Sequence, residues 1–131
     1  MSRRLPLALS VLILTAVFIA SFPASAHHSV PGQFDMSKSM TLKGAVSRVE
    51  WINPHIYISL DVKEADGTTT TWSLETLPTA MMRKAGLTKE SIVGPPGEIV
   101  TVQVLPARDG TKHLAFLQQI TYADGRYYKV G

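Results

Sequence analysis

The clearest pattern along the chain is the alternation of apolar and polar side chains over residues 56–62. Ile56, Ile58 and Leu60 fall on one face of an extended segment, whereas Tyr57 and Ser59 fall on the other. A period of two residues is typical of a strand that is buried on one side only. We therefore expect these residues to form a strand that covers one side of a core.

The same period predicts four more strands, separated by turn residues. Alternation over residues 40–51 changes phase near Ser47-Arg48, which indicates a β-bulge, and Asn53-Pro54 predicts the turn into the next strand. The remaining strands are predicted at residues 69–75, 98–106 and 112–122.

Asp66-Gly67 determines how the second and third strands pair. The apolar residues of both strands must share one face, because a shift of one residue would turn one set toward solvent. A three-residue loop with Gly67 in the left-handed conformation has the correct parity, whereas a two-residue loop does not. With this loop, Glu75 lies opposite Tyr57 on the outward face.

One short helix is predicted between the third and fourth strands. It covers residues 78–85, with Thr76 as a possible cap, Pro78 in the first turn and Gly86 after the end. A connection over 87–97 follows, with one turn after Thr88. Three strands, a helix and two strands are the element order of the OB fold. We expect an all-β protein with small α content: a five-stranded OB-like barrel.

Residues 1–26 have the pattern of a secretory signal peptide. Arg3 and Arg4 precede an apolar stretch over residues 7–22, and Ala24-Ser25-Ala26 offers a cleavage site. A retained membrane anchor would need about 20 continuous apolar residues, and this stretch is shorter. The predicted organisation is a signal peptide at 1–26, an irregular lead-in at 27–39 and the barrel domain at 40–131.

Charge and cysteine content narrow the classes of function. The chain has 13 Lys and Arg against 10 Asp and Glu, and removal of residues 1–26 takes two arginines and no acid. A net charge of +1 lacks the basic surplus of a nucleic-acid binder. The absence of Cys excludes disulfides and thiolate sites. We expect a periplasmic or secreted protein with no nucleic-acid partner and, after processing, no stable membrane span.

The predicted mature terminus carries the first candidate site. Cleavage after Ala26 would place a free α-amine and an imidazole on His27, with a second imidazole on His28. An amine and its own imidazole chelate one ion, and nitrogen ligands suit Cu(II), Ni(II) or Zn(II). The alternative is a frayed terminus whose histidines have no function, because chain ends are usually mobile.

The segment from Trp51 to His55 is the second candidate. His55 shares the outward face with Tyr57, and the predicted register puts Glu75 within roughly 8 Å of His55. A carboxylate near an imidazole can orient a metal ligand. The alternatives are a structural turn set by Asn53 and Pro54, and a surface ion pair worth under about 1 kcal/mol.

Together these residues predict a binding protein, not an enzyme. The chain has no phosphate-binding loop, zinc-protease motif or nucleophile elbow. The leading hypothesis is that the protein binds a divalent metal such as copper, or another small ligand. The metal ligands would be His27, His28 and His55, and Trp51, Asn53, Tyr57 and Glu75 would complete the ligand site. The competing hypothesis is an interaction module that docks an envelope protein partner through the same strands and uses no metal.

Several of these motifs together resemble one protein family. They are Ala26-His27-His28-Ser29, Leu42-x-Gly44, Val49-Glu50-Trp51-x-Asn53-Pro54-His55, Trp72-x-x-Glu75 and Gly97-Glu98-x-Val100-x-Val102. The chain is similar over the whole predicted mature region to the DUF6152 family of exported bacterial proteins of unknown function. The resemblance implies export and an OB-like fold. It implies no activity.

Overall fold

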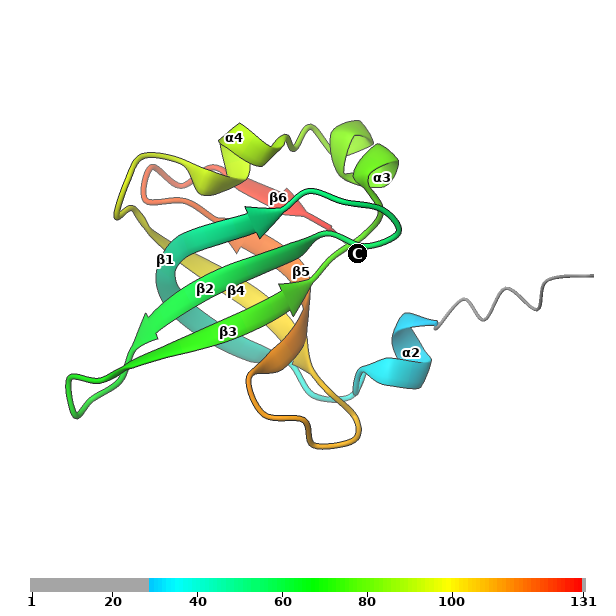
Figure 1. Ribbon diagram of the computed structural model, residues 1–131, viewed down its shortest axis with the longest axis horizontal. Coiled ribbons are helices and arrows are strands. Elements are labelled where there is room, and N and C mark those ends of the chain that lie inside the picture. The colour runs from blue at the N-terminus through cyan, green and yellow to red at the C-terminus, as the bar shows by residue number, and fades with distance from the viewer. Residues whose placement is uncertain (1–28, 131) are drawn as a thin grey trace, which may run out of the picture.

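The structure is a computed structural model that describes residues 29–130, and β-strands are its main regular structure (Figure 1). Each predicted strand is present, with bounds that differ from the sequence pattern by two residues or fewer. The elements in chain order are α2 (Val30–Gln33), β1 (Met40–Glu50), β2 (Tyr57–Lys63), β3 (Thr69–Glu75), α3 (Thr79–Lys84), α4 (Lys89–Val93), β4 (Ile99–Pro106), β5 (Leu114–Thr121) and β6 (Tyr127–Lys129).

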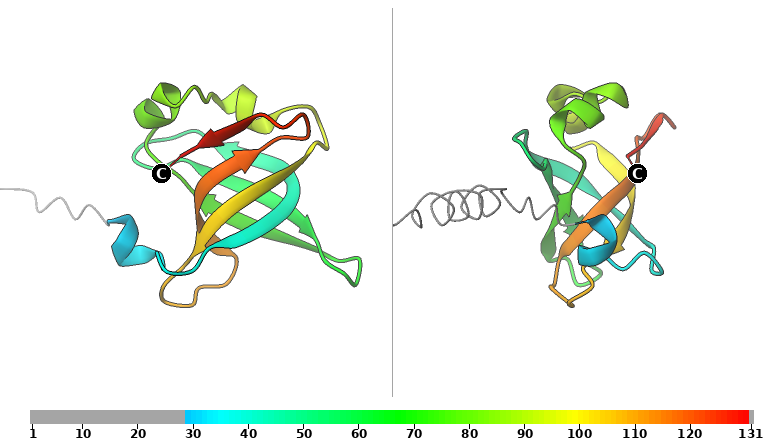
Figure 2. Two further views of the ribbon diagram at one scale, coloured as in Figure 1. Left: turned by 180° about the vertical axis from the view of Figure 1, so that it is seen from behind. Right: turned by 90° about the vertical axis from the view of Figure 1, so that its right-hand side faces the viewer.

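The strands form one sheet that closes on itself. Their order is β3-β2-β1-β4-β5-β6, with antiparallel neighbours, and a parallel pairing between β3 and β5 closes the barrel. Figure 2 shows the barrel from two further sides, with α3 and α4 at one end. The predicted five-stranded OB-like barrel is confirmed.

The bulge and the hairpin register are also confirmed. The β1–β2 ladder shifts between Val46 and Arg48, close to the predicted position. Gly67 has φ 87° in a loop closed by the hydrogen bond from Glu64 N to Thr68 O, 2.9 Å. A three-residue loop of this kind keeps the parity described above, and it pairs Tyr57 with Glu75.

The barrel encloses one hydrophobic core and carries a second, smaller core outside. The inward faces of the strands, with Met82, Leu87 and Ile92 from the helical segment, fill the interior. The second cluster, which we call the outer core, consists of Phe34, Leu105 and Phe116. It lies where the lead-in packs against β4 and β5. Residues 30–34 are therefore part of the folded structure.

Two predictions about the connecting segments were incomplete. The lead-in was expected to be irregular, but α2 forms one helical turn there, because Pro31 is compatible with the first turn of a helix. Two short helices, not one, separate β3 and β4: α4 begins at the Thr88 cap, where one turn was predicted. The predicted cap of α3 was wrong, since Thr76 Oγ1 donates to Leu77 O and Pro78 precedes the helix.

Candidate functional site

Glu75 is the buried charged residue at the centre of the candidate site. It ends β3 on the outside of the barrel, yet only 4% of its surface is exposed. It pairs with Phe116 of β5, and Phe116 belongs to the outer core that covers this face. Of the alternatives that the sequence left open, an exposed surface pair is therefore excluded, because Glu75 is buried.

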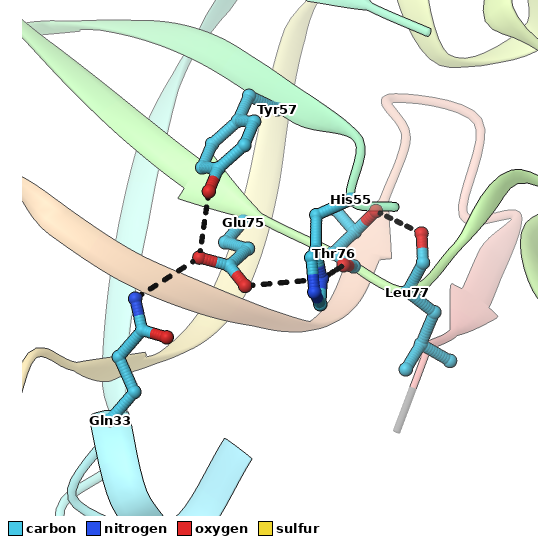
Figure 3. Close-up of polar contacts among 6 residues, drawn as sticks. All are labelled: Gln33, His55, Tyr57, Glu75, Thr76 and Leu77. Carbon is cyan, nitrogen blue, oxygen red and sulfur yellow. Dashed lines mark hydrogen bonds and ion pairs between the residues drawn. The ribbon is translucent and has the colours of Figure 1, made fainter. Parts of the chain in front are cut away.

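Three side chains surround the carboxylate (Figure 3). Tyr57 donates its hydroxyl to Oε2 at 3.1 Å, and the Gln33 carboxamide donates to the same oxygen at 3.2 Å. His55 Nδ1 lies 3.2 Å from Oε1. A carboxylate that accepts from several donors is held in one orientation. The sheet register supplies Tyr57, the β1–β2 loop supplies His55, and α2 supplies Gln33.

The neighbours of His55 define which ring nitrogen is free. Nδ1 lies near two acceptors, Glu75 Oε1 at 3.2 Å and the Thr76 carbonyl oxygen at 3.3 Å. Neither atom donates when Glu75 is ionised, so Nδ1 must carry the proton. The lone pair of the neutral imidazole is then on Nε2. About a third of the side chain is exposed, 31%, which leaves the ring open to a ligand.

The buried carboxylate of Glu75 has one basic neighbour and two neutral hydrogen-bond donors among the described residues. Within residues 29–130, His55 is the only basic side chain that forms an ion pair with Glu75. Burial and the nearby Glu75 carboxylate raise the pKa of Tyr57, so its hydroxyl remains a hydrogen-bond donor at neutral pH. The negative charge of Glu75 is thus met by two neutral donors and one imidazole.

Trp51 and Asn53 lie in the same loop as His55 and contact α3. Trp51 is half-buried against the main core, and the Arg83 guanidinium lies 6.0 Å from its ring centre. Asn53 Oδ1 accepts a hydrogen bond from Thr79 Oγ1 at 2.9 Å. These contacts fix the loop that carries His55.

Two predicted metal ligands, His27 and His28, lie outside the described residues. Within residues 29–130, no group of three or more His, Asp or Glu side chains is arranged to hold a metal ion. In the same part of the chain, no helix has the length and apolar content needed to cross a membrane. His55 and Glu75 are brought together as predicted. A metal ion bound at His55 would need further ligands from outside residues 29–130.

Gln33 and Thr76 are the members of the site that the sequence did not indicate. Gln33 lies 42 residues before Glu75 in a segment without periodicity, so only the packing of Phe34 reveals its position. Thr76 contributes its backbone carbonyl, which has no signature in the side-chain pattern. A capping or strand signal could not have identified either residue.

Comparison with known proteins gave one match. A family model described as a family of unknown function, DUF6152, matches residues 16–116. This range contains His55, Tyr57 and Glu75 and covers more than half of the chain. No curated protein and no solved structure matches the chain.

Proposed function

The chain belongs to the DUF6152 family, and since that family has no known function, we propose one from the site itself. The protein is a binding protein, not an enzyme, that is exported by a signal peptide over residues 1–26, which is then removed. It holds a divalent metal ion, most suitably Cu²⁺, at His55. Periplasmic or secreted localisation follows from the signal pattern of the first 26 residues.

One observation carries the proposal: His55 Nδ1 lies 3.2 Å from a carboxylate oxygen of the buried Glu75. Metal-binding histidines commonly donate their second ring N–H to a carboxylate or a carbonyl, which fixes the tautomer and strengthens the ligand. Here Glu75 and the Thr76 carbonyl oxygen both fill that role. A cation on Nε2 would also balance the buried negative charge.

A single imidazole does not hold a metal ion tightly, so further ligands are needed. We assign them to His27 and His28, which precede Gln33 by six and five residues. A stretch of six residues spans at most about 20 Å. Gln33 contacts the same carboxylate as His55, so this stretch is long enough to return to the imidazole. Cleavage after Ala26 would add the α-amine of His27 as a nitrogen donor.

The remaining residues of the predicted site support these ligands. Glu75 orients His55, Tyr57 holds the carboxylate, and the contacts of Trp51 and Asn53 with α3 keep the loop in place. Amine and imidazole nitrogens suit Cu(II), Ni(II) and Zn(II) better than hard oxygen-seeking cations. The expected preference is therefore for late transition metals over Mg²⁺ and Ca²⁺.

Calorimetric titration with Cu²⁺ tests the proposal on protein that begins at an authentic His27. We expect one ion per chain, and we expect H55A to weaken binding by at least about tenfold. A chain with one extra residue before His27 should also bind more weakly, because the α-amine is displaced. The matched control is His113→Asn, which removes an exposed histidine with φ 56° in the β4–β5 loop and should leave binding unchanged.

Two results would contradict the proposal. Absence of Cu²⁺ binding by the mature chain would remove the metal function altogether. Equal affinity in H55A and the unaltered protein would show that the terminal histidines bind the ion without the barrel.

A second candidate function is docking of an envelope protein partner without metal. A hollow between the end of β1 and α4 favours it, because Trp51, Ile52 and Val93 line this hollow beside Lys89. Ile52 is 56% exposed, and exposed apolar side chains in a concavity suit a partner. This function predicts that I52D abolishes recovery of a specific partner from periplasmic extract, while H55A has no effect.

A further inference from the structure

The second half of β1 has a strand on one side only. The ladder between β1 and β4 ends at Ala45, because β4 begins at its partner, Ile99. The ladder between β1 and β2 continues to Glu50, after a bulge between Val46 and Arg48. From Val46 onward, no described strand pairs with the side of β1 that faces away from β2, so this side is an open sheet edge. The helix α4 lies beside it (Figure 1).

The backbone groups of Val49 point toward this open edge. In an antiparallel sheet, successive residues direct their N–H and C=O groups to opposite neighbours. Thr76 N donates to Ile56 O at 2.9 Å, so Ile56 and every second residue after it face β3, and the residues between them face β1. The β1 partners of those residues are Arg48 and Glu50. Val49 lies between these two and therefore directs its N–H and C=O groups away from β2.

This edge can accept one more extended segment. Within the described part of the chain, neither backbone group of Val49 has a hydrogen-bond partner, and the residue is 5% exposed, so little water reaches it. An open edge of this kind is a template for an added strand. The hollow between β1 and α4 offers the space, because Val49, Trp51 and Val93 line it. A second copy of this chain is a poorer occupant, because its own α4 flanks its β1 edge.

The walls of the hollow determine the chemistry of such a segment. Ile52 and Val93 are 56% and 39% exposed, so apolar side chains can pack against them. Among the described residues, Arg48 is paired with Glu50 at 3.0 Å, whereas Lys89 forms no ion pair. The unpaired ammonium group gives the hollow a positive charge, which favours a carboxylate on the incoming segment.

We propose that the hollow binds an extended segment of a partner protein as an added strand on β1, with its backbone paired to Val49. The segment carries apolar side chains, which pack on Ile52 and Val93, and an acidic side chain that pairs with Lys89. Main-chain hydrogen bonds supply affinity in this mode of binding, and the side chains supply specificity. The inference rests on the docking function given above as the second candidate, and it names the kind of partner.

Amide hydrogen exchange in the free mature chain tests whether the edge is open. The Val49 amide should exchange at least about tenfold faster than the amides of Arg48 and Glu50, because only those two are bonded to β2. Equal protection of the three amides would show that the edge is closed, and it would overturn the inference without any ligand.

Random dodecapeptides displayed on phage serve as the probe for binding to the mature full-length chain. We expect the selected peptides to share an extended pattern of apolar residues with at least one acidic residue. I52D and K89E should each weaken their binding by at least about tenfold, since one removes an apolar wall and the other reverses the attracting charge. Met36→Asp and Lys112→Glu are the matched controls, because both change exposed side chains that do not line the hollow.

Two readouts distinguish strand addition from contacts made by side chains alone. The bound peptide should slow exchange of the Val49 amide to the rate of the Arg48 and Glu50 amides, because the Val49 N–H group gains an acceptor. Methylation of alternate backbone nitrogens of the peptide should abolish binding in one phase and not in the other, since only every second N–H group would face β1.

The outcomes separate this inference from the docking function. Binding that is lost in I52D and K89E but leaves the Val49 amide unchanged, and that tolerates methylation in both phases, would overturn strand addition and keep docking at the hollow. Failure to select any peptide whose binding depends on Ile52 would overturn the inference. If I52D also left recovery of the partner unchanged, the docking function would fall with it. Loss of binding in I52D, in K89E and in one methylation phase, with a slower Val49 amide, would support both.

Discussion

At the scale of single residues, the most informative feature is a buried carboxylate whose ion-pair partner is a histidine. Glu75 is 4% exposed and accepts from the Tyr57 hydroxyl and the Gln33 carboxamide. Burying a charge is costly unless it is compensated, and neutral donors compensate only part of that cost. A neutral residue of the same shape would remove the charge next to His55, but it would also place an amide N–H group opposite a hydrogen-bond donor.

The substitution Glu75→Gln separates these two roles. It keeps the shape of the side chain and removes the charge that faces His55 Nδ1. We expect metal affinity to fall by about 10–100-fold, and the free energy of unfolding to fall by about 1–3 kcal/mol, because the new amide N–H group faces a donor. Calorimetry and urea denaturation on the same preparation measure both quantities. Unchanged metal affinity in E75Q would show that the carboxylate does not act on the bound ion.

The sequence allowed part of this site to be predicted. Tyr57 and Glu75 follow from strand parity, because a three-residue loop leaves one possible register, and His55 follows from its place two residues before Tyr57. Burial of Glu75 was not predictable, since it depends on which segment covers the outside of the barrel. Gln33 was missed for the same reason: its contact spans 42 residues and has no periodic signal.

At the scale of elements, strands were easier to predict than the short helices. The apolar positions of β2 and β4 face one core, so the period of two is preserved in the sequence. In contrast, α2 is a single turn whose hydrogen bonds add little stability, and tertiary packing holds it in place. That packing depends on Phe34, which is buried between β4 and β5 residues.

Phe34→Ala tests the contribution of the outer core. The ring is 0% exposed and contacts Leu105 and Phe116, so its removal should leave a cavity and detach α2. We expect a loss of about 3–5 kcal/mol in the free energy of unfolding, measured by urea denaturation. Met36→Ala removes a side chain that is 51% exposed and should change stability by less than about 0.5 kcal/mol. Equal effects of the two substitutions would contradict the assignment of a second core.

Tyr122 links the segment after β5 to α4. It also makes the free energy of unfolding depend on pH in the alkaline range. Its hydroxyl donates to Ser91 O at 2.9 Å, and burial raises its pKa from 10.0 to about 12. The folded state therefore holds this proton more tightly than the unfolded state. The stabilisation is fully present below about pH 10 and is lost as the pH rises toward 12.

Tyr122→Phe removes this titration. Near pH 8 the unaltered protein should be the more stable by about 1 kcal/mol, because Y122F lacks the buried hydrogen bond. Between pH 10 and 12 the difference should shrink, since only the unaltered protein loses stability through this group. Urea denaturation at pH 8 and pH 11 provides the comparison. If the difference in the free energy of unfolding between the two proteins stays constant with pH, folding does not raise the pKa of Tyr122.

At the scale of the whole molecule, the closed barrel is a rigid support for a site on its outer surface. The β3–β5 pairing closes the sheet next to Glu75, and the outer core lies on the same side. The site thus combines a loop residue, a strand residue and a helix residue from distant parts of the chain (Figure 3). Element order predicted the barrel, but it did not predict which outward face would be covered.

The central claim is that His55 presents Nε2 as a metal ligand while Nδ1 stays protonated toward Glu75. Nitrogen-15 NMR of the imidazole in the mature chain, before and after addition of Zn²⁺, tests it most directly. The account predicts the Nδ1–H tautomer in the neutral ring without metal, and a change at Nε2 alone when Zn²⁺ binds. An Nε2–H tautomer in the metal-free protein, or a ring that does not respond to Zn²⁺, would contradict it.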